Sequence, residues 1–137
     1  MASVNVNDLN ELMNKISSEE LREQVEQVLL FFRMIDCTIE VTYSRENSEY
    51  YIEFGKDEHY FGSLCFLEDD EHSFSSIEVI SKHHRNLSKE FLTSENQDVL
   101  TRRMGGIRIH KIKTERGHNK AIEVLRRMQT LNVKEMK

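Results

Sequence analysis

Basic side chains crowd the C-terminal part of the chain, and two histidines lie among them. Nine Lys and Arg residues fall between positions 102 and 127, together with His110 and His118. Sets of this kind hold phosphate groups by neutralising charge and releasing counterions. One hypothesis is therefore a nucleic-acid-binding module, whose candidate phosphate contacts are Arg102, Arg103, Arg108, Lys111, Lys113, Arg116, Lys120 and Arg127.

The aromatic residues argue against one version of that hypothesis. All eleven Phe and Tyr residues precede position 92, so the basic segment has none on which single-stranded bases would stack. A basic cluster is also typical of a solvated surface, or of one that pairs with acidic residues of the same chain. Nucleic-acid binding therefore stands as an alternative rather than as the first interpretation.

The histidines supply a second alternative. Beside Lys and Arg, His110 or His118 would be suited to contact phosphate or to transfer protons during phosphodiester cleavage, as in a phosphodiesterase or nuclease. No catalytic motif surrounds either residue. The adjacent His83 and His84 lie in a segment expected to be extended, where neighbouring side chains point to opposite faces and cannot share a metal. We predict no metal site and no cofactor.

Acidic residues dominate the first part of the chain. Residues 1–81 contain 18 Asp and Glu against 5 Lys and Arg, whereas residues 82–137 contain 14 Lys and Arg against 6 Asp and Glu. Acidic and aromatic surfaces of this kind bind protein partners, although acidic turns are more often simply solvated. The asymmetry also suits two copies that associate head to tail. The candidate protein-interface residues are Tyr51, Glu68, Asp69, Asp70 and Glu71.

The two cysteines are expected to be buried, reduced thiols. Cys37 and Cys65 lie in apolar surroundings and form no Cys-x-x-Cys pair. Cys37 also follows an expected helix, and the dipole at a helix C-terminus opposes thiolate formation. A cysteine nucleophile is therefore disfavoured, and reduced thiols favour a cytoplasmic location.

Two helices are expected in the N-terminal part, residues 1–36. The first spans about 7–16. Ser17 and Glu20 resemble a capping box, in which each side chain bonds to an open backbone N–H of the other residue. They precede a helix over 18–36, whose apolar residues recur at spacings of three and four and so share one face: Leu21, Val25, Val28, Leu29, Phe32 and Ile35.

Residues 37–81 change to a period of two, which indicates strands. Short polar turns separate successive apolar runs, and such turns join antiparallel neighbours. We therefore predict an antiparallel meander with strands over 38–43, 50–54, 60–67 and 74–81.

Residues 82–137 are predicted to form a basic helix–strand–helix part. Leu87, Phe91 and Leu92 allow one or two helical turns, and a second possible capping box at 94–97, with Gly105 as the stop, predicts a helix over 94–104. An alternating segment over 107–112 predicts a strand, and the spacing of apolar residues predicts a final helix over 115–131.

Together these elements predict one α+β domain over residues 1–137, with the order α-α-β-β-β-β-α-β-α. An antiparallel sheet of four to five strands would carry helices on one face. No apolar run approaches the length of a membrane span, and the N-terminus does not resemble a secretory signal. The first interpretation is a small, non-catalytic intracellular binding or regulatory protein, an adaptor or inhibitor that acts by protein–protein contact.

Overall fold

An antiparallel sheet organises the molecule. The structure, a computed structural model, describes residues 6–69, 73–84, 86–103 and 105–130. The sheet has six strands in the order β1-β2-β3-β4-β6-β5, which confirms the α+β class but exceeds the four to five strands expected. The strands are β1 (Thr38–Ser44), β2 (Glu49–Lys56), β3 (His59–Glu68), β4 (Phe74–Ser81), β5 (Leu100–Arg103) and β6 (Gly106–Ile109).

The first four strands form the predicted meander. Val41 pairs with Ile52, Ile52 with Leu64, and Leu64 with Val79, so one apolar residue from each strand falls in the same row. Because side chains alternate along a strand, this register places the apolar residues on one face and leaves the polar ones on the other.

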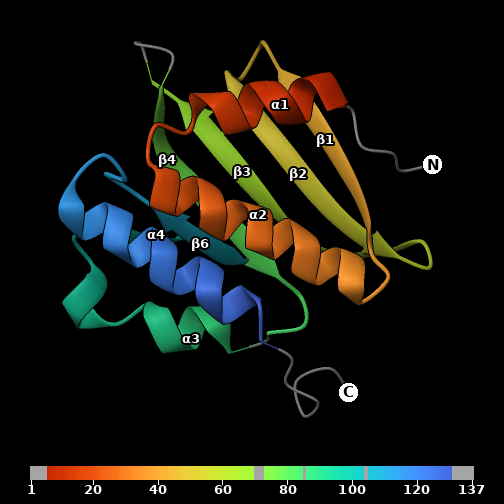
Figure 1. Cartoon of the computed structure of the whole chain (residues 1–137). Helices are drawn as coiled ribbons and strands as arrows, with labels where there is room; N and C mark the ends of the chain where they lie inside the picture. The colour runs from red at the N-terminus through yellow and green to blue at the C-terminus, as the bar shows by residue number, and fades with distance from the viewer. Residues whose placement is uncertain (1–5, 70–72, 85, 104, 131–137) are drawn as a thin grey trace.

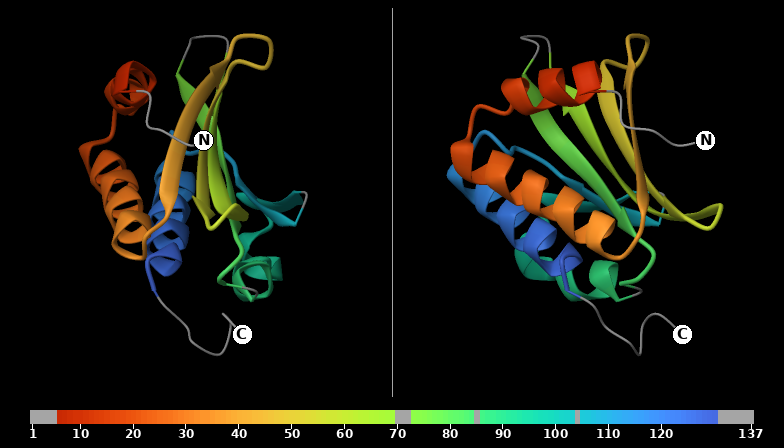
Figure 2. Two further views of the ribbon diagram at one scale, coloured as in Figure 1. Left: turned by 90° about the vertical axis from the view of Figure 1, so that its right-hand side faces the viewer. Right: turned by 45° about the vertical axis from the view of Figure 1, so that its right-hand side comes forward.

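Three helices cover the apolar face. They are α1 (Val6–Lys15), α2 (Glu19–Met34) and α4 (Glu115–Met128), and they lie on the same side of the sheet (Figure 1). In the edge-on view of Figure 2, no helix of the described residues lies against the opposite face of β1–β3. The short helix α3 (Leu87–Phe91) lies at the end of the sheet where β4 stops.

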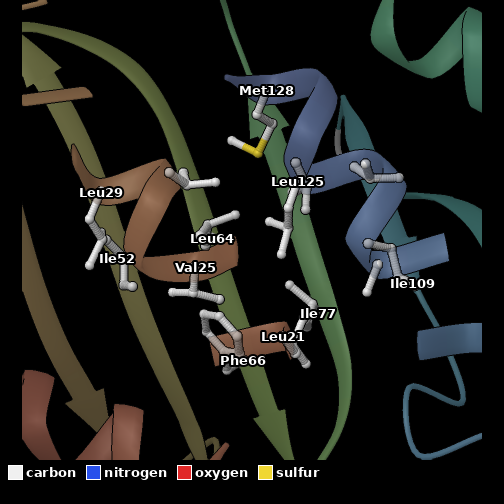
Figure 3. Close-up of a cluster of buried hydrophobic side chains, with 14 of the residues drawn as sticks. Leu21, Val25, Leu29, Ile52, Leu64, Phe66, Ile77, Ile109, Leu125 and Met128 are labelled. Atoms are coloured by element: carbon white, nitrogen blue, oxygen red, sulfur yellow. The ribbon is translucent and has the colours of Figure 1, made fainter. Parts of the chain in front are cut away.

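The core lies between the two long helices and the sheet. Figure 3 shows Val25 of α2 and Leu125 of α4 directed toward Leu64, Phe66 and neighbouring strand residues. Val25, Leu64, Phe66 and Leu125 are completely buried. Burying side chains of this size contributes about 1.5–3 kcal/mol each, so this contact is what holds the helices on the sheet.

The start of α2 differs from the expected capping box. The cap is Ser18, not Ser17: its Oγ accepts a hydrogen bond from the Leu21 backbone N–H at 3.1 Å. Ser17 is exposed. Both serines fit the sequence pattern of a helix cap, and the observed helix begins one residue later than the pattern based on Ser17 predicts.

The helix predicted over 94–104 is wrong. A 3₁₀ turn at Ser94–Asn96 leads instead to β5, and Gly105 provides the turn between β5 and β6 with a φ of +85°. Val99 and Leu100 bury their side chains at the edge of the sheet core, which outweighs the local capping pattern.

Strand β6 also ends earlier than expected, at Ile109. Lys111 adopts a φ of +56°, which breaks the extended backbone. The first turn of α4 then packs on this bend. A Cβ atom at Gly117 would lie 2.1 Å from the carbonyl oxygen of Lys111 and 2.5 Å from that of His110, so only glycine permits the contact.

Among the described residues, no helix combines the length and the apolar character that crossing a membrane requires.

Candidate functional site

The basic candidates on the sheet are paired with a carboxylate. Arg108 on β6 lies directly opposite Glu78 on β4, and its Nη2 is 2.5 Å from Glu78 Oε2. The Arg108 Nε also donates to the same oxygen at 3.2 Å. Arg103 approaches the other carboxylate oxygen, with an Nε–Oε1 distance of 3.6 Å. One acidic side chain therefore offsets one of the two positive charges of these candidate phosphate contacts.

The basic candidates of α4 are engaged in the same way. Arg116 donates to both carboxylate oxygens of Asp98, at 3.0 and 3.1 Å, and to the Glu95 carbonyl at 2.6 Å. These hydrogen bonds lower the pKa of Asp98 and raise that of Arg116. The Arg127 Nε lies 2.9 Å from a carboxylate oxygen of Glu90.

The remaining basic candidates fall into two groups. Lys113 pairs with Asp69, and the Lys120 Nζ lies 2.8 Å from Glu123 Oε2. Arg102 and Lys111 are exposed and form no ion pair within the described residues. The structure thus places most of the predicted phosphate contacts in internal pairs rather than in one open patch.

The acidic turn is engaged within the chain as far as the structure describes it. The side chain of Glu68 is 1% exposed and accepts from Lys15 Nζ at 2.5 Å and from the Tyr43 hydroxyl at 3.0 Å. The hydrogen bond to Glu68 raises the pKa of Lys15. Asp69 accepts from the backbone N–H and the hydroxyl of Ser73, both at 3.2 Å. Asp70 and Glu71 lie outside the described residues.

We call the sheet face opposite the helices the outer face. The strand register places a row of side chains across it. Tyr51 lies in that row and is half-buried. The row consists of Thr42, Tyr51, Cys65, Glu78, Arg108 and Thr101.

Two carboxylates on the outer face are opposed rather than paired. Glu40 of β1 lies directly opposite Glu53 of β2. Neither forms an ion pair among the described residues, and Glu53 is exposed. Like charges at directly opposite positions of an antiparallel pair are destabilising. The sequence interpretation missed this pair, although the two predicted strands contained both residues.

The centre of the outer face is polar but chemically inert. Burial, and then the hydrogen bond from its Sγ to Glu49 Oε2 at 3.3 Å, raise the pKa of Cys65, so the thiol stays protonated at neutral pH. Burial raises the pKa of Tyr60 to about 12, and its hydroxyl lies 2.6 Å from Ser63 Oγ. These groups offer hydrogen bonds and aromatic surface rather than a nucleophile.

His83 and His84 do not point to opposite faces, so that prediction is wrong. Strand β4 ends at Ser81, and the chain then turns, which brings both rings to the same side, 3.9 Å apart. Ser81 Oγ lies 3.2 Å from His83 Nδ1 and 3.0 Å from His84 Nδ1. The other ring nitrogens contact the Met128 carbonyl and the Thr130 hydroxyl, at 3.1 and 3.0 Å. This buried pair ties the end of β4 to the end of α4.

The two candidate catalytic histidines each contact a hydroxyl group. His110 Nε2 lies 2.8 Å from Thr101 Oγ1 on the outer face, and burial, followed by the charge of Arg108, lowers the pKa of His110. His118 Nε2 lies 2.7 Å from Ser18 Oγ, on the helical side of the molecule. The His118 Nδ1 lies 3.7 Å from Glu20 Oε1.

No group of three possible metal ligands lies together in the part of the chain that the structure describes. No family model, curated protein or solved structure matches the chain.

Proposed function

We propose that this protein is a small binding protein, an adaptor or inhibitor, that docks a basic surface of a protein partner on its outer face. The observation that carries the proposal is the opposed pair of Glu40 and Glu53 on the outer face of β1 and β2, which no helix of the described residues covers. The buried, reduced cysteines support a cytoplasmic location.

A basic partner group would relieve the repulsion within this pair. An arginine placed between Glu40 and Glu53 would bond to both carboxylates, and charge-assisted bonds of this type are about twice as strong as neutral ones. Tyr51, two residues before Glu53 on the same face, adds aromatic surface on which a guanidinium group stacks. The partner would thus be recognised by charge and by a flat aromatic contact.

The internal ion pairs favour this function over nucleic-acid binding. A phosphate backbone would have to displace Glu78 from Arg108 and Asp98 from Arg116 before it reached those guanidinium groups. Arg102 and Lys111 are the candidates exposed without such a competitor among the described residues. Nucleic-acid binding through these two residues is the second candidate function, and duplex DNA and RNA binding at low salt tests it.

The test of the binding function is capture of a partner from the native host by chemical crosslinking. The Glu53→Lys variant is compared with Glu26→Lys, which makes the same charge change at an exposed position on α2, away from the outer face. A stoichiometric partner that is lost with Glu53→Lys and kept with Glu26→Lys supports the proposal.

Equal capture by both variants, or the absence of any stoichiometric partner, contradicts it. Recovery of a second copy of this chain would instead support the self-association that the charge asymmetry suggested, and sedimentation of the purified protein would then measure the dimer.

A further inference from the structure

Hydroxyl groups contact imidazole rings at three places among the described residues, and one of these places differs in kind. Thr101 contacts His110 on the outer face, and Ser81 contacts a buried histidine pair. At the third place Ser18 contacts His118, and there, alone among these described contacts, the other ring nitrogen forms an ion pair with a carboxylate, that of Glu20. We propose that Ser18, His118 and Glu20 form a nucleophilic centre that hydrolyses small acyl esters.

The distances suit a hydroxyl activated by a base. Ser18 Oγ lies 2.7 Å from His118 Nε2, within the range for proton transfer to a base. The His118 Nδ1 lies 3.7 Å from Glu20 Oε1, beyond hydrogen-bond distance, so the carboxylate acts through its charge and favours the tautomer that carries its hydrogen on Nδ1. That tautomer leaves Nε2 free to accept the Ser18 proton.

The capping role of Ser18 does not compete with this chemistry. Its oxygen accepts from the Leu21 N–H at 3.1 Å, which uses a lone pair and leaves the hydroxyl hydrogen for His118. The same N–H stabilises negative charge on the oxygen. The first N–H groups of a helix have no acceptor within the helix, so those of Glu19 and Glu20 are available to a developing oxyanion.

A groove beside Ser18 is the site where the ester substrate would bind. It has a volume of about 170 Å³, and its apolar wall includes Ile16, Leu21, Phe74 and Ile112. An apolar wall of this size suits a short acyl chain. An adjoining, wider opening is lined by Lys113, Thr114 and Glu115, where a polar leaving group would lie.

The reaction proceeds in two balanced steps. Ser18 Oγ forms a bond to the ester carbonyl carbon while His118 takes its proton, and the carbon–oxygen bond to the alcohol breaks as His118 returns that proton to the leaving oxygen. Water, activated by His118, then attacks the acyl-serine, releases the carboxylic acid and restores the hydroxyl. Glu20 is a positioning residue that acts through His118.

This inference does not depend on the proposed binding function, because the centre lies on the helical side and the binding pair lies on the outer face. It revises the sequence-based expectation of a non-catalytic protein. Ser18 and His118 are separated by 100 positions, so no local motif joins them.

The test uses two probes on the full chain: a fluorophosphonate, which labels activated serines, and p-nitrophenyl butyrate. We expect one label per chain, at Ser18, and release of p-nitrophenol. Ser18→Asn retains a helix-capping side chain but has no hydroxyl, so it should fold, with an unchanged circular dichroism spectrum, and lose both signals. Thr101→Ala removes the matched hydroxyl from His110 and should retain both.

The remaining variants separate the roles. His118→Ala should lower turnover about 100-fold or more, as expected for loss of a general base. Glu20→Gln should lower turnover less, because Glu20 is 59% exposed, and Glu20→Asp should restore it. Absence of labelling in the wild-type protein, labelling at another residue, or retained hydrolysis in a folded Ser18→Asn variant overturns the proposal and shows that Ser18 serves only as a cap.

Discussion

The two halves of the outer face treat their charges in opposite ways. At the β4–β6–β5 half, Glu78 contacts both Arg103 and Arg108 and offsets one of their two positive charges. At the β1–β2 half, Glu40 faces Glu53 across the strands, and neither forms an ion pair with any described residue. Folding has satisfied one half and left the other under electrostatic repulsion. The Glu40–Glu53 repulsion destabilises the isolated chain, and binding of a basic partner group would remove that repulsion.

The comparison also changes the meaning of the charge asymmetry. By composition, the conspicuous feature is the basic segment at positions 102–127. By structure, most basic residues of that segment have an acidic partner, and the carboxylates of β1 and β2 without a cation partner among the described residues include Glu40 and Glu53 on the outer face. Net charge along a sequence therefore says little about which charges are available to bind.

The largest expected effect is a loss of partner affinity when the charge of Glu40 is reversed. Glu40→Lys should convert the repulsive pair into an ion pair within the chain and remove the site for a basic partner group. We expect the affinity for a captured partner to fall by about 2 kcal/mol or more, roughly 30-fold. Calorimetry with Glu26→Lys as the matched control measures it, and an affinity that falls equally in both variants would show a general charge effect.

The next largest effect is a loss of stability when Glu78, the acidic partner of Arg103 and Arg108, is removed. Glu78→Ala leaves the guanidinium of Arg108, whose side chain is 24% exposed, without its carboxylate. We expect the free energy of unfolding to fall by about 1–2 kcal/mol in urea denaturation. Glu123→Ala, which removes the 51% exposed partner of Lys120 one turn away on α4, should cost less than about 0.5 kcal/mol. Equal losses would mean that Glu78 is no more important to the fold than a surface ion pair.

A smaller effect has the opposite sign. Glu53→Gln removes one of two facing charges, so the free energy of unfolding should rise by roughly 0.2–1 kcal/mol. The same variant should bind a partner more weakly. A gain in stability with a loss of binding marks a residue kept for function; a loss of stability would show that the pair is not repulsive in the folded chain.

The smallest effect concerns pH. Arg116 lowers the pKa of Asp98 below its ordinary value of 3.8, so the folded state binds this proton less readily than the unfolded state. The contribution of Asp98 to stability is therefore present above that value and is lost as pH falls below it. Asp98→Asn should flatten this acid limb of the stability curve. An identical limb in the variant would assign acid sensitivity to other carboxylates.

The sequence predicted the elements whose patterns are regular. The strand over 74–81 has the observed bounds, and the helix over 18–36 contains α2 because its apolar spacing runs through the whole segment. The segment 94–104 failed because a capping pattern is local, whereas β5 has one buried residue, Leu100, and depends on pairing with β6. Contacts between distant residues, such as Ser18 with His118, had no local signal at all.

The hydrogen-bonded chain through the buried histidine pair contains more contacts than there are hydrogen atoms to form them. A chain of five contacts runs from the Met128 carbonyl through His83, Ser81, His84 and Thr130 to the Arg127 carbonyl. Each contact needs one hydrogen, and both ends can only accept. Two hydroxyls and two neutral imidazoles supply one hydrogen each, which is one too few. Either one ring carries an extra proton or one contact lacks its hydrogen, and the ¹⁵N shifts of the two rings distinguish these states.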